Sequence, residues 1–192
     1  MDKWVIPNPF ISALFTTLRG FGVELSDFSF NKEPANVAET YLNVSVRRLS
    51  AAIRVGVNAV TYIAANPDWK MAPQLVEVFD LVSERIRGML RVRPEYQEAT
   101  LAFHVNPGPA DFKVSTASLV NPSLADKALF CGISLHRTDG ALIIDKSLRH
   151  DGAAFVRLQC RFPGDAPFSE VASRLYGDEV SALRLLGVTG VV

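Results

Sequence analysis

Apolar residues recur at every second position in several segments of this chain, and this period of two constrains the fold more than any other feature. Leu42, Val44 and Val46 alternate with polar residues, and Ala154 to Phe162 repeats the pattern further along. Such alternation is typical of antiparallel strands with one solvated face. Several of these segments follow one another directly, which argues against a doubly wound parallel sheet, where strands and helices take turns.

Three segments show helical spacing instead. Apolar residues recur at intervals of three and four in residues 9–19, 73–93 and 167–186, although Gly177 and Asp178 can interrupt the last of these. We therefore predict an α+β fold: a twisted antiparallel sheet with two long helices and a short N-terminal helix packed on one face.

The domain organisation follows from length and from the absence of a flexible linker. A chain of 192 residues fits a single domain, residues 1–192. Strands followed by a helix occur twice, however, and an Ala-Pro pair opens each long helix. A weak internal duplication of residues 21–93 and 95–187 is therefore an alternative description.

Charge and hydropathy bear on the partners. Twenty basic and twenty acidic residues cancel, so we expect neither nucleic acid nor a membrane surface as a partner. No apolar run reaches the length of a spanning helix, and Asp2 with two early prolines does not suit a secretion signal, so we expect a soluble, cytoplasmic protein. Hydrophobic residues make up 48% of the chain, a surplus that a homo-oligomer interface would bury.

No motif demands a particular chemistry. Cys131 and Cys160 lie in alternating apolar runs, so we expect both to be buried and reduced. His104, His136 and His150 lie outside any ligand motif, and the Gly20–Gly22 segment precedes a predicted strand rather than a helix. We accordingly predict no catalytic residue, no metal site and no cofactor.

Four residues are nevertheless candidates for ligand binding. Arg157 and Arg161 share one face of a predicted strand, where they either keep the face soluble or bind an acidic ligand. His104 lies on another strand and is the third candidate. Trp69, in a predicted loop, either plugs the end of the sheet or anchors a partner.

Two functional hypotheses follow. The first is a non-catalytic binding or assembly module that self-associates and presents an apolar groove or sheet face to a peptide or protein partner. The second is an enzyme or small-ligand binder, with a pocket between sheet and helices that holds an acidic ligand through its arginines. The lack of catalytic motifs and the surplus of apolar residues favour the first.

Overall fold

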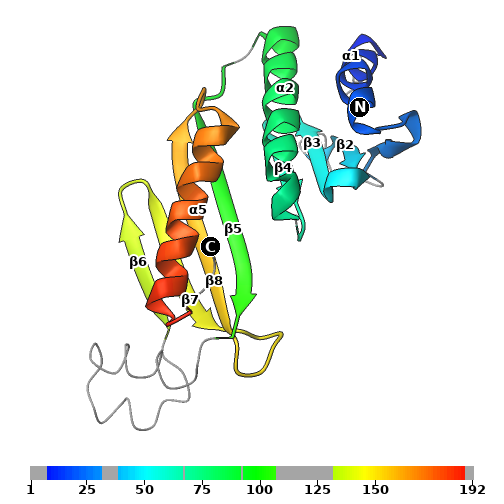
Figure 1. The fold of residues 1–192 in the computed structure, drawn as a ribbon. Helices are drawn as coiled ribbons and strands as arrows, with labels where there is room; N and C mark the ends of the chain where they lie inside the picture. The colour runs from blue at the N-terminus through cyan, green and yellow to red at the C-terminus, as the bar shows by residue number, and fades with distance from the viewer. Residues whose placement is uncertain (1–7, 32–38, 67, 92, 107–131, 189–192) are drawn as a thin grey trace, which may run out of the picture. The chain divides into compact units, whose positions relative to one another are not determined.

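The computed structural model describes residues 8–31, 39–66, 68–91, 93–106 and 132–188. The chain divides into two compact units, Met1–Arg93 and Pro94–Val192. The described residues form two antiparallel four-stranded sheets and three α-helices, so the predicted α+β class is confirmed (Figure 1). The expectation of one sheet is wrong, because the strands of each unit pair only among themselves.

The first unit is a meander flanked by helices. Its elements are α1 (Asn8–Leu18), β1 (Phe28–Phe30), β2 (Tyr41–Val46), β3 (Ala51–Gly56), β4 (Val60–Ala64) and α2 (Ala72–Leu90). The strand order β1-β2-β3-β4 follows the sequence. Local hairpins suffice for this topology, and the alternating apolar residues of β2 and β3 are buried.

The turn between β2 and β3 accounts for the break in the alternation. Arg47–Leu49 form one 3₁₀ turn, and Ser50 follows with a positive φ of 49°. Ala51 then pairs with Val46, which returns the apolar side chains of β3 to the buried face. The slip in the hydrophobic pattern is thus a tight turn.

The segment before β1 differs from the prediction. The strand predicted directly after Gly20–Gly22 does not begin there, because Leu25–Asp27 form a 3₁₀ turn and β1 begins at Phe28. The buried carboxylate of Asp27 accepts the backbone N–H of Glu24 at 2.9 Å. Its Oδ1 also forms an ion pair with Arg47, whose Nε lies 2.7 Å away, although this contact lacks hydrogen-bond geometry. Polar side chains that bond to the nearby backbone favour turns over strands.

The second unit is a sheet covered by one helix. Its elements are β5 (Tyr96–Val105), β6 (Ile133–Arg137), β7 (Gly140–Lys146), β8 (Ala154–Pro163) and α5 (Phe168–Leu185). The strand order is β5-β8-β7-β6, and a tight turn at Thr138 and Asp139 joins β6 to β7, as the Asp-Gly pair predicts.

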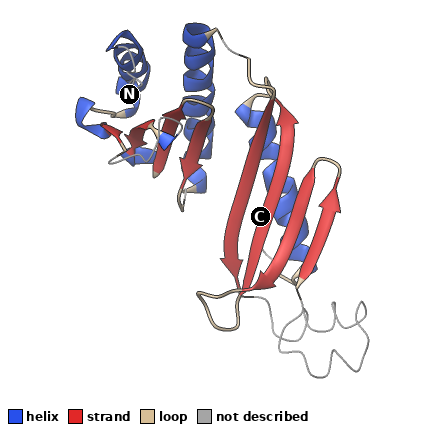
Figure 2. Cartoon of the chain, turned by 180° about the vertical axis from the view of Figure 1, so that it is seen from behind, coloured by secondary structure: helices blue, strands red, loops and turns tan. Residues whose placement is uncertain are grey.

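Helix α5 covers one face of this sheet (Figure 2). Ala182 of the helix and Leu186, which follows it, pack with Ile144, Val156 and Leu158 of the strands, and all five are almost fully buried. The helix continues through Gly177 and Asp178. Asp178 is therefore a helical residue, and its side chain makes the contacts described below.

The two units share a plan but not a topology. Each contains a four-stranded antiparallel sheet followed by a helix, but the first sheet is a simple meander and the second places β5 beside β8. The single domain over residues 1–192 and the duplication of residues 21–93 and 95–187 both stay predictions.

Candidate functional site

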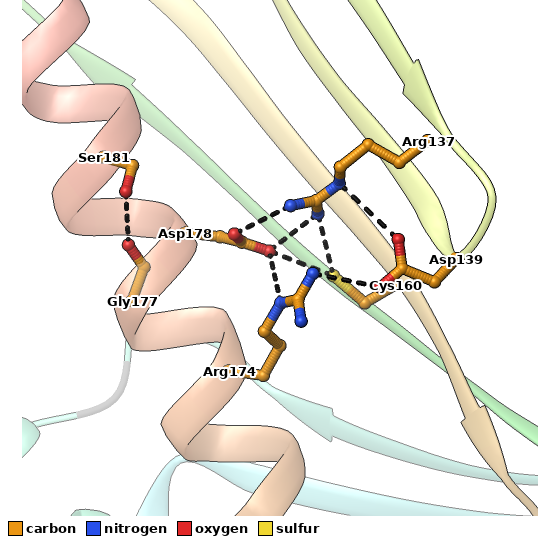
Figure 3. A network of polar contacts seen from close by, with 7 residues as sticks. All are labelled: Arg137, Asp139, Cys160, Arg174, Gly177, Asp178 and Ser181. Carbon is orange, nitrogen blue, oxygen red and sulfur yellow. Dashed lines mark hydrogen bonds and ion pairs between the residues drawn. The ribbon is translucent and has the colours of Figure 1, made fainter.

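A cluster of polar contacts joins the β6–β7 hairpin to α5 (Figure 3). Arg137 donates to both carboxylate oxygens of Asp178, at 3.0 and 2.8 Å. Arg174, one helical turn before Asp178, donates to that carboxylate at 3.3 Å and to Asp139 at 3.0 Å. We call Arg137, Asp139, Arg174 and Asp178 the Arg–Asp network. Its two cations and two anions neutralise one another.

The network alters the acidity of its members. Hydrogen bonds from Arg137 lower the pKa of Asp178 from 3.8 to about 2, against the opposing effect of burial. The same hydrogen bonds raise the pKa of Arg137. Asp178 is only 16% exposed, whereas Arg137 and Arg174 are 35% and 43% exposed. The ion pairs are therefore partly screened by solvent, and each is worth less than a buried one.

Cys160 lies beside this network on β8. Its thiol is buried and donates to Asp178 Oδ2 at 3.3 Å, while Arg137 donates to the sulfur at 3.6 Å. Burial, together with Asp178, raises the thiol pKa. A protonated, buried thiol is a poor nucleophile, which agrees with the predicted inert cysteine. Cys131 lies outside the described residues.

An open pocket of about 610 Å³ adjoins the network. It lies between the end of β8 and α5, and Asp139, Arg174 and Asp178 contribute to its wall. Its volume suits a small molecule. Asp139, Arg174 and Asp178 in its wall are already paired, so an anionic ligand would have to displace one of these carboxylates from an arginine. Arg161 and Glu170 also line the pocket.

Arg157 and Arg161 lie on the opposite face of the sheet. They alternate along β8 with Val156, Leu158 and Cys160, which pack beneath α5, and both arginines are exposed. Arg161 stacks over the ring of Tyr96, with its Cζ 3.9 Å from the centroid. The two side chains share a face, as predicted, and this face is opposite α5. Arg161, but not Arg157, also lines the pocket beside the Arg–Asp network.

His104 lies at the far end of the same face, which we call the uncovered face because no described helix of the second unit packs on it. Its ring contacts Phe155 and His150, with centroids 5.2 and 5.0 Å apart. Its Nδ1 lies 2.9 Å from the hydroxyl of Ser147, which also accepts the backbone N–H groups of Arg149 and His150. Because Ser147 is buried and accepts two backbone hydrogen bonds, this Ser–His pair fixes a turn rather than activating a nucleophile.

The remaining candidate, Trp69, lies elsewhere. Trp69 opens the 3₁₀ turn Trp69–Met71 of the first unit, and its side chain lies outside the described part of the structure. His136 lies on β6, where its ring nitrogen is 3.0 Å from the hydroxyl of Ser134. The sheet therefore brings together Arg157, Arg161 and His104 on one face, and Trp69 belongs to the other unit.

The sequence alone did not predict the Arg–Asp network, since Asp178 indicated only a possible interruption of the last helix. One local signal was available, because Arg174 and Asp178 are four residues apart and so face each other along a helix. The contribution of Arg137 comes from a contact distant in sequence and carries no local signal.

The described residues contain no group of three or more His, Cys, Asp or Glu side chains placed to hold a metal ion. None of the helices in this part of the chain is long and apolar enough to cross a membrane. Fold and site thus define an α+β protein with two antiparallel sheets and a charge-neutral Arg–Asp network. Comparisons with protein-family models, curated proteins and solved structures found no match.

Proposed function

We propose that this chain is a non-catalytic binding and assembly module, which self-associates and presents the uncovered face of the β5-β8-β7-β6 sheet to a peptide or protein partner. The observation that carries the proposal is the stack of Arg161 on Tyr96 on that face. Arginine and tyrosine are the residue types enriched at the centres of protein interfaces. The stack also holds the long arginine side chain in place, which lowers the entropy lost on binding.

The polar contacts elsewhere in the unit support the same proposal. The Arg–Asp network and the Ser147 turn use their polar groups to join elements of the fold. On the uncovered face, Gln159 donates to Glu98 at 2.8 Å, which ties the neighbouring strands β5 and β8 together through their side chains. A face ordered by such contacts suits a protein surface better than a small ligand.

Two measurements on the full chain test the proposal. Analytical ultracentrifugation should give a mass above the 21.0 kDa of one chain at micromolar concentration. Titration with citrate and phosphate, as simple anionic probes followed by NMR, should give no saturable binding. A monomer at all concentrations would overturn the self-association.

The double variant Arg157→Ala/Arg161→Ala separates the two functional hypotheses. Saturable anion binding that this variant abolishes would establish a site for acidic small ligands instead of a module. The matched control is Arg149→Ala/Arg184→Ala, which removes two exposed arginines of the same unit from outside the strands. Anion binding that both double variants weaken equally would reflect net charge and not a site.

A further inference from the structure

Strand β5 forms one edge of its sheet. It pairs with β8 in an unbroken register from Tyr96↔Pro163 to Val105↔Ala154, and no described strand pairs with its other edge (Figure 2). At ten residues it equals β8 in length. The other described edge strands are shorter: β1 has three residues, and β4 and β6 have five each.

The hydrogen-bond pattern shows which backbone groups point away from β8. Arg161 N donates to Asp139 O, and Ser147 N donates to Ala153 O, so the odd-numbered residues of β8 direct their backbone groups towards β7. The even-numbered residues of β8 therefore bond to β5, where their partners are the odd-numbered residues 97–105. The backbone groups that face the free edge belong to Tyr96, Glu98, Thr100, Ala102 and His104.

This edge lacks the usual protection against strand pairing. Natural edge strands carry lysine, proline or a bulge, or are kept short. β5 contains no lysine and no proline, its register with β8 has no bulge, and Glu98 is its only Asp, Glu, Lys or Arg residue. Leu101, Phe103 and Val105 on its helix side are only partly buried beneath α5. An additional strand would cover them and bond to the free backbone groups.

We infer that β5 pairs antiparallel with β5 of a second copy of this chain, which joins two four-stranded sheets into one of eight strands. The inference rests on the proposed self-association and names the surface that performs it. In such a dimer a two-fold axis runs perpendicular to the sheet, so the α5 helices of both copies lie on the same side of it. Each even-numbered residue of β5 must therefore face an even-numbered residue of the second copy, and each odd-numbered residue an odd-numbered one.

The side chains of β5 are complementary to themselves in one such register. When Leu101 faces Leu101 of the second copy, Ala99 faces Phe103 on the helix side and Glu98 faces His104 on the uncovered face. The symmetry makes the Ala99–Phe103 and Glu98–His104 pairs twice and the Leu101 pair once. Apolar pairs directly across a strand pair are stabilising, and the Glu98 carboxylate can accept a hydrogen bond from an imidazole N–H of His104. A second copy thus supplies both kinds of pair in one arrangement.

A proline at an outward-facing position tests the inference. Ala102→Pro removes an N–H that β8 does not use, so the fold tolerates it, but it blocks a strand on the free edge. The matched control is Ser134→Pro, an outward-facing position on β6 at the other edge of the same sheet. Sedimentation should give twice the mass of one chain for wild type and Ser134→Pro, and the mass of one chain for Ala102→Pro.

Amide hydrogen exchange keeps the test valid if Ala102→Pro is less stable. In the wild-type dimer both the odd-numbered and the even-numbered amides of β5 should be protected. In Ala102→Pro the amides of Leu101 and Phe103 should stay protected by β8, while those of Glu98 and Thr100 should exchange rapidly. Loss of protection at Leu101 and Phe103 would show that Ala102→Pro unfolds the strand. In that case Thr100→Lys, which keeps the backbone N–H, replaces the proline variant in the test.

The outcomes separate this inference from the proposed function. A wild-type dimer that survives Ala102→Pro, with Thr100 and Glu98 still protected, overturns the β5 pairing but leaves self-association standing. A wild-type monomer overturns the self-association itself. If the amide of Thr100 in a wild-type dimer is protected from exchange only after a peptide is added, the edge of β5 binds another partner and not a second copy.

Discussion

The guanidinium of Arg137 and the carboxylate of Asp178 form a two-point contact, at 3.0 and 2.8 Å, between the end of β6 and the middle of α5. Two parallel hydrogen bonds fix the orientation of both groups as well as their distance. Arg174 completes the contact from the preceding helical turn. The helix is thereby held to the β6–β7 hairpin by polar contacts and to β8 by apolar ones.

Loss of the carboxylate should loosen that attachment. Asp178→Asn removes the charge that Arg137 and Arg174 share, and we expect the free energy of unfolding to fall by about 1 to 2 kcal/mol, since the arginines are partly exposed. Urea denaturation followed by circular dichroism measures the loss. Asp165→Asn, at an exposed carboxylate after β8, is the control and should change stability by less than about 0.5 kcal/mol. Equal losses in both variants would contradict the assignment.

The same ion pair predicts a pH dependence. The pKa of Asp178 falls to about 2 in the folded protein, from 3.8 for a free carboxyl. A lowered pKa contributes stability that is complete above about pH 5 and is lost as the pH falls towards 2. The difference in unfolding free energy between wild type and Asp178→Asn should therefore be constant from pH 5 to 7 and shrink between pH 4 and 2. A difference that persists undiminished at pH 2 would refute the pKa shift.

Cys160 should be unreactive in the folded protein. Its thiol is buried and its pKa is raised, so little thiolate forms at pH 7. In a Cys131→Ser background, where Cys160 is the remaining thiol, reaction with Ellman's reagent should be at least about tenfold slower in buffer than in denaturant. Rapid stoichiometric reaction of the folded protein at pH 7 would show that the sulfur is accessible.

Gly140 should be intolerant of a side chain. A Cβ at this first residue of β7 would overlap the carbonyl of Gln159 on the neighbouring strand. We expect Gly140→Ala to lower the free energy of unfolding by about 1 to 3 kcal/mol. Gly177→Ala is the matched control in the same unit, because a Cβ there meets nothing within 4 Å. In helix α5 that substitution should stabilise the protein by about 0.5 to 1 kcal/mol. Thermal melting of both variants checks the opposite signs.

Locally determined features were predictable from the sequence. The period of two predicted β2 and β8, and the three-and-four spacing after an Ala-Pro pair predicted α2. The Asp-Gly pair predicted the β6–β7 hairpin. Each of these depends on residues within one turn or one pair of neighbouring strands, so the residues that determine it are adjacent in the chain.

The features that escaped prediction depend on distant contacts. Alternation shows that β5 is a strand but not that it pairs with β8 instead of β6. The same limit applies to Arg137 and Asp178, which lie 41 residues apart. The separation of the strands into two sheets also escaped, because alternation marks the buried face of a strand without showing which strands share a sheet.

The placement of β5 beside β8 has a consequence for the order of folding. During translation β5 emerges before β6, β7 and β8, and its only described strand partner is the last of these to be made. Pairing between strands so far apart in the sequence is slow, because the whole segment between β5 and β8 must first be closed into a loop. The meander of the first unit can form meanwhile from neighbouring hairpins. A nascent chain that ends before β8 thus presents both edges of β5, and we expect truncated products of this length to aggregate.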